Sequence, residues 1–330
     1  MSNFVEIAGW GMHLPSQVLS NFDLEKMVET SDEWIRTRSG ISERRLVADG
    51  ESTSTIATKA ASAALNRAGV RPDDVDLIIV ATASPDYVGL PATAPLVQHA
   101  LGARNCGAFD VMAGCSGFVY GLATASQFIL SGAYRHVLLI GAEALSRVVD
   151  WTDRATCVLF GDGAGAVLLR ATNKEGGLLS FVLGSDGSGV EHLFIPAGGA
   201  RLPASHETVE RRQHYIKMNG REVYKFASRI LPQAFKQAVE RAGVRPQDVD
   251  LLVPHQANIR IIESARNGLA VDENTVYVNV DRYGNTSAAS IPVALCEAIE
   301  EGRLKPESLV AMVAFGAGLT WASALWRWQG

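Results

Sequence analysis

RAGVRPDDVDL, at Arg67–Leu77, occurs a second time as RAGVRPQDVDL at Arg241–Leu251. Ten of the eleven positions are identical, and the second copy starts 174 residues further along the chain. Each copy ends a predicted helix, turns at Gly and Pro, and enters a β-rich run. A period of this length is typical of a duplicated domain and not of a solenoid. The sequence therefore predicts two similar halves that pack as one body.

The similarity between the halves continues beyond these eleven residues. Phe109-Asp110 precedes MAGCSG in the first half, and Val280-Asp281 precedes RYGNTSAAS in the second. Each turn is followed by a helical stretch of small residues and then by an apolar strand. Strands that alternate with helices predict an α/β fold in which helices cover the sheets. We expect an N-terminal half at residues 1–172 and a C-terminal half at residues 173–330.

Composition and charge favour an ordinary globular protein. The 330 residues are 47% hydrophobic and 20% charged, with a net charge of -5 and a pI near 5.8. Proteins that bind nucleic acid usually carry a strongly basic surface, so no nucleic-acid partner is expected. The longest apolar runs, Val137–Ile140 and Leu309–Phe315, are too short to span a bilayer. No signal peptide is visible, so we expect a cytoplasmic protein without a membrane partner.

The four cysteines are far apart in the sequence and form no C-x-x-C motif. They are Cys106, Cys115, Cys157 and Cys296. This spacing argues against a zinc site or a redox motif, and no metal is expected.

The two halves carry different reactive groups at equivalent positions. At the strand-to-helix turn, the first half has Cys115 in AGCSG and the second has Asn285 in YGNTS. After the repeated RAGVRP turn, the first strand enters the unreactive Val80–Thr82, whereas the second leads to His255 in VPHQAN. Ligands of α/β sheets bind beyond the carboxyl ends of strands. Cys115, His255 and Asn285 are therefore the candidate site residues.

Each of the three residues also has a structural interpretation. The helix that follows Cys115 is expected to lower the pKa of its thiol and to raise the thiolate fraction. The alternative is a small buried hydrophobe, which we accept for the other cysteines. His255 alone is more often structural, and Asn285 alone could cap the following helix. A papain-like Cys-His-Asn protease would require C-G-[SA]-C-[WY] around its cysteine, and AGCSGF does not match that pattern.

The sequence resembles the thiolase-like condensing enzymes over almost its whole length, and most closely the β-ketoacyl-acyl carrier protein synthase III family. The motifs that carry the resemblance are TSDEWIRTRSGI (Thr30–Ile41), FDVMAGCSGF (Phe109–Phe118), TDRATCVLFGDGAGAVLL (Thr152–Leu169), LVPHQANIRII (Leu252–Ile262), DRYGNTSAASIP (Asp281–Pro292) and AFGAGLTWASAL (Ala314–Leu325). The resemblance implies a thiolase-like fold with two pseudo-symmetric halves in an α-β-α-β-α arrangement. Elongating synthases carry a second His where this chain has Asn285, and biosynthetic thiolases use a second Cys. Asn285 therefore favours the initiating branch.

The resemblance also implies a reaction. Cys115 would accept an acyl group from acyl-CoA as a thioester. His255 and Asn285 would hydrogen-bond the thioester carbonyl of malonyl-acyl carrier protein as carbon dioxide leaves. The product would be a β-ketoacyl-acyl carrier protein, the first condensation product of type II fatty acid synthesis.

Residues near the end of the chain would support this chemistry. The backbone N–H groups of Cys115 and of the Gly316-Ala317-Gly318 turn, with Ala317 preferred, would hold the tetrahedral oxyanion. Phe315 resembles the phenylalanine that crowds the malonyl carboxylate in the family. Many members have glycine where this chain has Ala317, which narrows the turn but leaves its N–H donor.

Further positions match the substrate channel and the surfaces of the family. The residues that would bind CoA are Trp34, Arg38, Arg154, Asn258 and Arg260. The residues of a basic patch for the acidic carrier protein would be Lys225, Arg260 and Arg266. Leu90, contributed by the partner of a homodimer, and Met112 would bear on the length of the acyl pocket. No permanently bound cofactor is expected, because acyl-CoA is a substrate.

Two other functions remain open from the sequence. The first is a specialised condensing enzyme or acyltransferase of polyketide or other secondary metabolism with the same Cys-His-Asn set. The second is a non-catalytic partner subunit of the chain-length-factor type. Such subunits generally lose the cysteine, and this chain retains all three residues.

Overall fold

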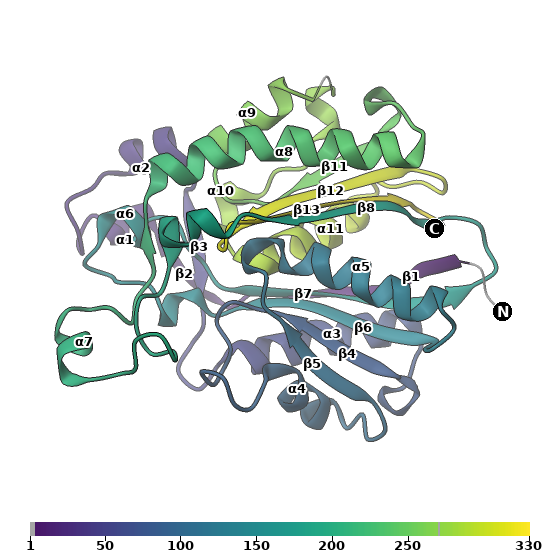
Figure 1. Ribbon diagram of the computed structural model, residues 1–330, viewed down its shortest axis with the longest axis horizontal. Helices are drawn as coiled ribbons and strands as arrows, with labels where there is room; N and C mark the ends of the chain where they lie inside the picture. Colours follow the sequence, from purple (N-terminus) through teal and green to yellow (C-terminus); the bar gives the residue numbers. More distant parts are fainter. Residues whose placement is uncertain (1–3, 270) are drawn as a thin grey trace.

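The computed structural model describes residues 4–269 and 271–330, and two sheets form its centre (Figure 1). The five-stranded sheet has the strand order β1 (Phe4–His13), β7 (Gly163–Thr172), β6 (His136–Glu143), β4 (Leu77–Ala81), β5 (Gly107–Val111). The four-stranded sheet has the order β8 (Gly177–Ser185), β13 (Thr320–Arg327), β12 (Leu309–Gly316), β11 (Leu251–Pro254). One sheet is thus built from the first half of the chain and the other from the second.

The two sheets have equivalent topologies. In the first sheet β4 is parallel to β6, β6 is antiparallel to β7, and β7 is antiparallel to β1. In the second sheet β11 is parallel to β12, β12 is antiparallel to β13, and β13 is antiparallel to β8. A single parallel bridge between Leu252 and Val276 stands where β5 lies in the first sheet. We propose that the halves meet at residue 172, and the change of sheet between β7 and β8 supports this boundary.

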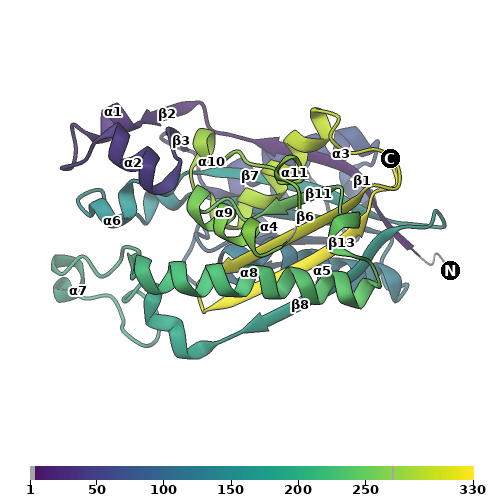
Figure 2. The same cartoon turned by 90° about the horizontal axis from the view of Figure 1, so that it is seen from above.

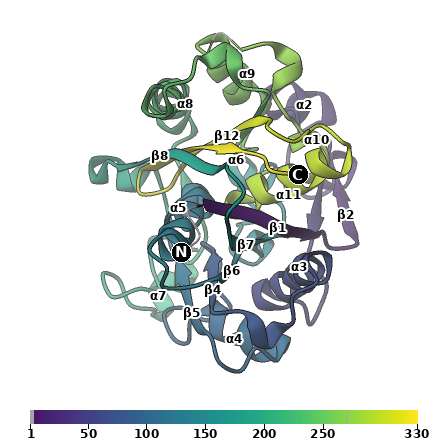
Figure 3. The ribbon, with the colours of Figure 1, turned by 90° about the vertical axis from the view of Figure 1, so that its right-hand side faces the viewer.

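Three layers of helix enclose the two sheets (Figures 1 and 3). The outer layer on the first sheet consists of α3 (Thr53–Ala68) and α4 (Thr93–Leu101). The layer between the sheets consists of α5 (Gly117–Leu130) and α11 (Ser290–Glu300). The outer layer on the second sheet consists of α8 (Gly220–Ala242) and α9 (Ile259–Asn267). The predicted α-β-α-β-α arrangement is therefore confirmed.

The repeated segment has the same local structure in both halves. Helix α3 ends at Gly69 with φ 64°, and helix α8 ends at Gly243 with φ 69°, both in the left-handed region that glycine tolerates best. A short 3₁₀ turn follows each glycine, at Pro72–Asp74 and at Pro246–Asp248, and leads directly into β4 and β11. The sequence identity thus marks one helix–turn–strand unit used twice.

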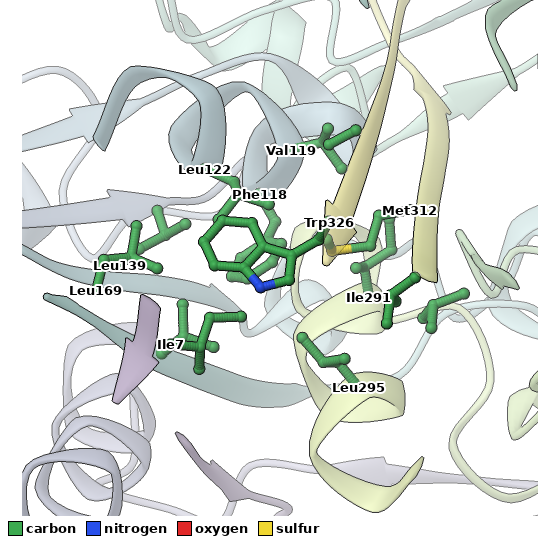
Figure 4. Packing of buried hydrophobic residues seen from close by; sticks show 14 of the residues in the cluster. Ile7, Phe118, Val119, Leu122, Leu139, Leu169, Ile291, Leu295, Met312 and Trp326 are labelled. Atoms are coloured by element: carbon green, nitrogen blue, oxygen red, sulfur yellow. The ribbon is translucent and has the colours of Figure 1, made fainter. Parts of the chain in front are cut away.

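The central core lies between the two sheets and joins the halves. Trp326 of β13 is 1% exposed and packs among apolar side chains of both sheets and of the middle helices (Figure 4). Neighbours shown in Figure 4 include Phe118 of α5, Leu139 of β6 and Leu295 of α11. One indole therefore contacts elements from both halves.

We expect Trp326→Ala to lower the free energy of unfolding by about 3 to 5 kcal/mol, because it removes a large buried side chain from a packed core. Urea unfolding followed by circular dichroism measures this change. Val209→Ala is the control, since Val209 is 63% exposed and its truncation should cost less than about 0.5 kcal/mol. If both substitutions changed the free energy of unfolding equally, the packing of Trp326 between the halves would not contribute to stability.

Short elements gather at the end of the molecule opposite the termini (Figure 2). They are β2 (Gln17–Ser20), α1 (Asn21–Leu24), α2 (Asp32–Ser39), β3 (Glu43–Leu46), α6 (Arg154–Cys157), β9 (Leu193–Phe194), α7 (His206–Glu210), β10 (Lys217–Met218) and α10 (Val280–Tyr283). Strands β4, β5 and β11 direct their carboxyl ends toward this side, which is where α/β proteins place their sites. Across the described residues, no helix combines the length and the apolar character needed to cross a membrane.

Candidate active site

Cys115, His255 and Asn285 line one cavity of about 360 Å³. Cys115 follows β5, His255 follows β11, and Asn285 follows α10. Asn285 is also tied to the first half, because it forms a parallel bridge with Phe160. The structure therefore brings together three residues that are as much as 170 positions apart in the sequence.

Cys115 lies at the boundary between two cavities. It lines the cavity that holds His255 and Asn285, and it also lines a second cavity of about 410 Å³. The walls of this second cavity are mainly apolar and include Leu145, Val148 and Ile216. A group bound to the sulfur could thus extend into an apolar space while its carbonyl faces the polar residues.

The backbone at Cys115 packs tightly against the turn that follows β12. A Cβ atom at Gly316 would lie 2.5 Å from the Cys115 amide nitrogen, and one at Gly114 would lie 2.7 Å from the Ala317 nitrogen. Only glycine permits this approach, and Gly114 also has a left-handed φ of 53°. The hydroxyl groups of Ser116 and Thr320, 2.7 Å apart, link the two turns. The predicted oxyanion donors, Cys115 and Ala317, therefore lie on adjoining backbone segments.

The expected effect of the helix on the Cys115 thiol is not the dominant one. Helix α5 does begin just after Cys115, at Gly117. The side chain is only 7% exposed, however, and burial raises the pKa of the Cys115 thiol to about 12. This direction is opposite to the one expected from the helix, because loss of hydration disfavours the charged sulfur in the unliganded protein. Cys115 rests as a neutral thiol.

His255 is held so that one ring nitrogen faces the cavity. Its Nδ1 lies 2.7 Å from the Ser290 hydroxyl oxygen, and that oxygen accepts the Gln256 backbone N–H at 3.3 Å. Ser290 can then donate its own proton to Nδ1, which places the ring proton on Nε2. In the described structure Nε2 is buried and has no hydrogen-bond partner. An Nε2–H group is thus available to a ligand.

The surroundings of His255 keep its ring neutral. Burial lowers the pKa of His255 to about 3, and no charged group offsets this effect among the residues that the structure describes. The Phe315 ring packs against the imidazole, with 5.4 Å between ring centroids and an interplanar angle of 62°. His255 is therefore arranged as a hydrogen-bond donor and not as an acid or base near neutral pH.

Asn285 is not the N-cap of helix α11. That helix begins at Ser290, and the residue at its N-cap position is Ala289. The Asn285 Oδ1 atom instead accepts the Ser287 backbone N–H at 2.9 Å. This contact fixes the amide orientation, because only the oxygen can accept, and it leaves the NH₂ group to donate into the cavity. Asn285 therefore does not cap α11 itself, although its oxygen accepts the first N–H of the 3₁₀ turn Ser287–Ala289 that leads into the helix.

Comparisons of the sequence and of the fold with known proteins point to one family. Models of 3-oxoacyl-[acyl-carrier-protein (ACP)] synthase III match residues 109–187, and their C-terminal counterpart matches residues 239–328. β-Ketoacyl-[acyl-carrier-protein] synthase III of Symbiobacterium thermophilum is 56% identical over 324 residues, which cover 98% of each chain. The chain belongs to the β-ketoacyl-[acyl-carrier-protein] synthase III family.

Other members agree with this assignment. The enzyme of the same name from Caldanaerobacter subterraneus is 54% identical and covers 98% of this chain and 97% of its own. The crystal structure of the 3-oxoacyl-[acyl-carrier-protein] synthase III from Aquifex aeolicus is 47% identical, with a TM-score of 0.91 over 98% of this chain and 100% of its own. The predictions of a thiolase-like fold and of a condensing acyltransferase that initiates fatty acid synthesis are confirmed.

Of the five positions that would bind CoA in a synthase III, three line the cavity and the other two contact each other. Arg38, Asn258 and Arg260 line the cavity, and the Asn258 side chain donates to the Arg38 carbonyl at 3.0 Å. The Arg154 guanidinium carbon stands 4.9 Å from the centre of the Trp34 ring. An aromatic ring and several arginines thus lie near one another on elements from both halves.

Two further residues at this cavity were not predicted from the sequence. Arg221 and Tyr224, at the start of helix α8, line the cavity together with Arg260. The sequence gives little indication of a role for them, because a charged or polar residue in the first turns of a long helix is usually a solvated surface group.

Two positions assigned to the carrier-protein patch are engaged in local ion pairs. Lys225 pairs with Glu222 at 2.6 Å, and Arg266 pairs with Glu273 at 2.8 Å. Arg260, which lines the cavity, is the exposed cation of this patch nearest the cavity mouth. The pairing weakens the positive field of Lys225 and Arg266 but leaves their side chains on the surface.

The two residues assigned to the acyl pocket differ in position. Met112 lines both the apolar cavity and an adjoining cavity of about 510 Å³. Leu90 is 87% exposed and does not line either cavity of its own chain. Tyr87 and Val88 of the same loop are also exposed, at 54% and 83%. An apolar loop therefore projects from the surface beside the opening of the pocket.

Proposed function

We propose that the chain loads a short acyl group from acyl-CoA onto Cys115 and condenses it with malonyl-acyl carrier protein. In the first step the sulfur attacks the acyl-CoA carbonyl, and CoA leaves as its thiol with the proton that Cys115 loses. The observation that carries the proposal is the place of Cys115 between an apolar cavity and a cavity lined by hydrogen-bond donors. The acyl chain occupies the first, and the thioester carbonyls face the second.

The second step uses the two donors on the C-terminal half. The malonyl carboxylate leaves as carbon dioxide, and negative charge develops on the thioester oxygen of the resulting enolate. The His255 Nε2–H and the Asn285 NH₂ group stabilise this oxygen, because both are fixed before the substrate arrives. The enolate carbon attacks the acyl-cysteine, and the intermediate collapses to a β-ketoacyl-acyl carrier protein and a Cys115 thiolate, which takes up a proton.

The groups around the reacting atoms have supporting roles in this proposal. The N–H groups of Cys115 and Ala317 hold the tetrahedral oxyanion, with Gly316 and Gly318 allowing the close turn. Phe315 packs on the His255 ring and excludes water from the carboxylate as it leaves.

CoA and the carrier-protein arm enter through the mouth of the polar cavity. The Trp34 ring and the Arg154 guanidinium offer a surface for the adenine, and Arg38 and Arg260 offer donors for the phosphates. The acidic carrier protein docks on the rim formed by Lys225, Arg260 and Arg266. CoA and the carrier protein are substrates and partners, and no resident cofactor is assigned.

We further propose that two copies of the chain form a homodimer in the cytoplasm. The exposed loop with Tyr87, Val88 and Leu90 is apolar, which is unusual for a surface that faces water. In a dimer this loop covers the adjoining cavity of the other copy, so that Leu90 closes the acyl pocket together with Met112. The four free cysteines fit a reducing compartment.

Intact-protein mass spectrometry with a panel of acyl-CoAs tests the proposed function. We expect short acyl-CoAs to add the mass of one acyl group, and malonyl-acyl carrier protein then to remove it with release of carbon dioxide. Acyl chains too long for the apolar cavity should load slowly, so the panel also identifies the primer.

Two outcomes would contradict the proposal. One is the absence of any acyl adduct on the wild-type protein. The other is transfer of the acyl group to an alcohol or amine without loss of carbon dioxide, which would favour an acyltransferase of secondary metabolism instead.

A further inference from the structure

Glu143 is a buried acid that has no part in the proposed reaction. It is the last residue of β6 and has an exposed fraction of 0%. Ionisable side chains are rarely buried this deeply without a partner or a function. Its position at the end of a central strand places it beside the segment after Asn285.

The Glu143 carboxylate accepts hydrogen bonds from two segments of the chain. In the first half, the Ala83 N–H donates at 3.1 Å, the Ser84 hydroxyl at 2.5 Å and the Thr82 hydroxyl at 3.2 Å. In the second half, the Ala288 N–H donates at 3.3 Å, and the Ser287 hydroxyl also interacts with it. One carboxylate thus joins the strand end beside the acyl cavity to the turn that carries Asn285.

No cation takes part in this cluster within the described ranges 4–269 and 271–330. Burial raises the pKa of Glu143, and the hydrogen bonds oppose that shift. The buried carboxyl group is therefore held by hydrogen-bond donors alone. A group that replaces this carboxylate must accept hydrogen bonds from the same donors, because a buried donor without an acceptor destabilises the fold.

Ser287 connects Glu143 to the reacting groups. Its φ of 46° lies in the left-handed region, which is costly for a residue with a side chain. In this conformation its N–H donates to the Asn285 Oδ1, and its hydroxyl interacts with both the Cys115 sulfur and the Glu143 carboxylate. The orientation of the Asn285 amide therefore depends on a strained residue that Glu143 helps to hold.

We infer that Glu143 is a positioning residue: it fixes Ser287, and through Ser287 the Asn285 amide, for decarboxylation of the malonyl substrate. This inference rests on the proposed function, since it assigns a task to a residue of that same site. The Cys115 backbone depends instead on Ser116 and Thr320. The Glu143 charge also raises the pKa of the Cys115 thiol, so removing that charge should not slow the loading of Cys115. We therefore place the positioning role of Glu143 in the second half-reaction.

Glu143→Gln tests this assignment, because glutamine keeps the shape but turns an NH₂ group toward donors. We expect the kcat for carbon dioxide release from malonyl-acyl carrier protein to fall about 10- to 100-fold, with KM within about threefold of wild type, since misplacement of a donor costs rate. Loading of Cys115 by acyl-CoA should not fall, because loss of the Glu143 charge removes an effect that raises the pKa of the Cys115 thiol. Equal losses in both half-reactions, or no loss in either, would overturn the inference.

A double-mutant cycle separates positioning from general damage. If Glu143 acts through Asn285, then Glu143→Gln should cost less than about threefold in an Asn285→Ala background. Fully additive losses would show that Glu143 acts elsewhere. Asp162→Asn is the matched control, because Asp162 is also fully buried and burial raises the pKa of its carboxyl group. Its carboxylate likewise accepts hydrogen bonds, from the Val47 N–H and the Ser146 hydroxyl. It should leave the ratio of the two half-reaction rates unchanged.

Two further variants keep the test decisive if Glu143→Gln does not fold. Ser287→Ala removes only the connecting hydroxyl and should reduce carbon dioxide release in the same direction. Glu143→Asp retains a carboxylate and should recover part of the rate lost in Glu143→Gln. Normal turnover by Ser287→Ala would contradict the assignment, whereas a wild-type protein that neither loads acyl groups nor releases carbon dioxide would contradict the proposed function itself.

Discussion

Replacing Cys115 with alanine should abolish the acyl adduct and lower the rate of condensation by about 10⁵- to 10⁶-fold, the loss typical of removing a catalytic nucleophile. Cys115 lines both the apolar cavity and the cavity of His255 and Asn285, so its sulfur can carry an acyl group between them. Because those two donors remain, slow release of carbon dioxide from malonyl-acyl carrier protein should persist without condensation. Mass spectrometry of the intact protein and a carbon dioxide assay measure the two effects separately.

Cys296→Ala is the control for this experiment. Cys296 is fully buried, and burial raises the pKa of its thiol to about 12, as it does for Cys115. It lies in helix α11 and lines neither cavity. The control should therefore load acyl groups normally. If the acyl adduct persisted in Cys115→Ala and disappeared in Cys296→Ala, then Cys296 would be the nucleophile and the role proposed for Cys115 would be wrong.

Replacing His255 with alanine should lower carbon dioxide release about 100- to 1000-fold, the usual cost of removing one preorganised donor to a developing oxyanion. Acylation of Cys115 should continue, because the sulfur and its backbone turn do not depend on the imidazole. His136→Ala is the control, since His136 contacts the Asp74 carbonyl far from the site. A His255→Ala protein that releases carbon dioxide at the wild-type rate would remove His255 from the mechanism.

The pH dependence gives a second test of the role of His255. Its pKa is lowered to about 3, so the ring stays neutral and Nε2 stays protonated as pH falls from about 8 to about 5. Carbon dioxide release should therefore show no loss attributable to His255 over this range. A fall in rate with an apparent pKa near 6.5, the ordinary value for histidine, would mean that water reaches the ring and that it titrates normally.

Much of the fold could be predicted because the sequence contains the same helix–turn–strand unit twice. The RAGVRP turns predicted two equivalent helix–turn–strand units, and glycine at Gly69 and Gly243 is needed because both have a left-handed φ. The difference between Cys115 and Asn285 at equivalent turns then identified the side of the molecule that carries the chemistry. These features are local, and local geometry follows from short stretches of sequence.

Other features depend on contacts that no short stretch encodes. Glu143 reads as the end of an apolar strand, and its importance arises from donors on Thr82–Ser84 and Ser287-Ala288. Arg221 reads as an ordinary exposed helix residue until helix α8 places it at the mouth of the cavity. Ser290 reads as part of a small-residue helix, yet it sets the tautomer of a histidine 35 positions away.

The sequence by itself predicted the duplicated α/β architecture and the family resemblance, and it pointed to Cys115, His255 and Asn285 as the candidate reactive set. Only the tertiary structure decided their surroundings: a buried thiol with a raised pKa, an imidazole whose Nδ1 faces the Ser290 hydroxyl, and an amide whose oxygen accepts the Ser287 N–H. The physical reason is that residue type fixes which reactions a group can perform, whereas its charge and orientation depend on burial and on donors brought from distant parts of the chain.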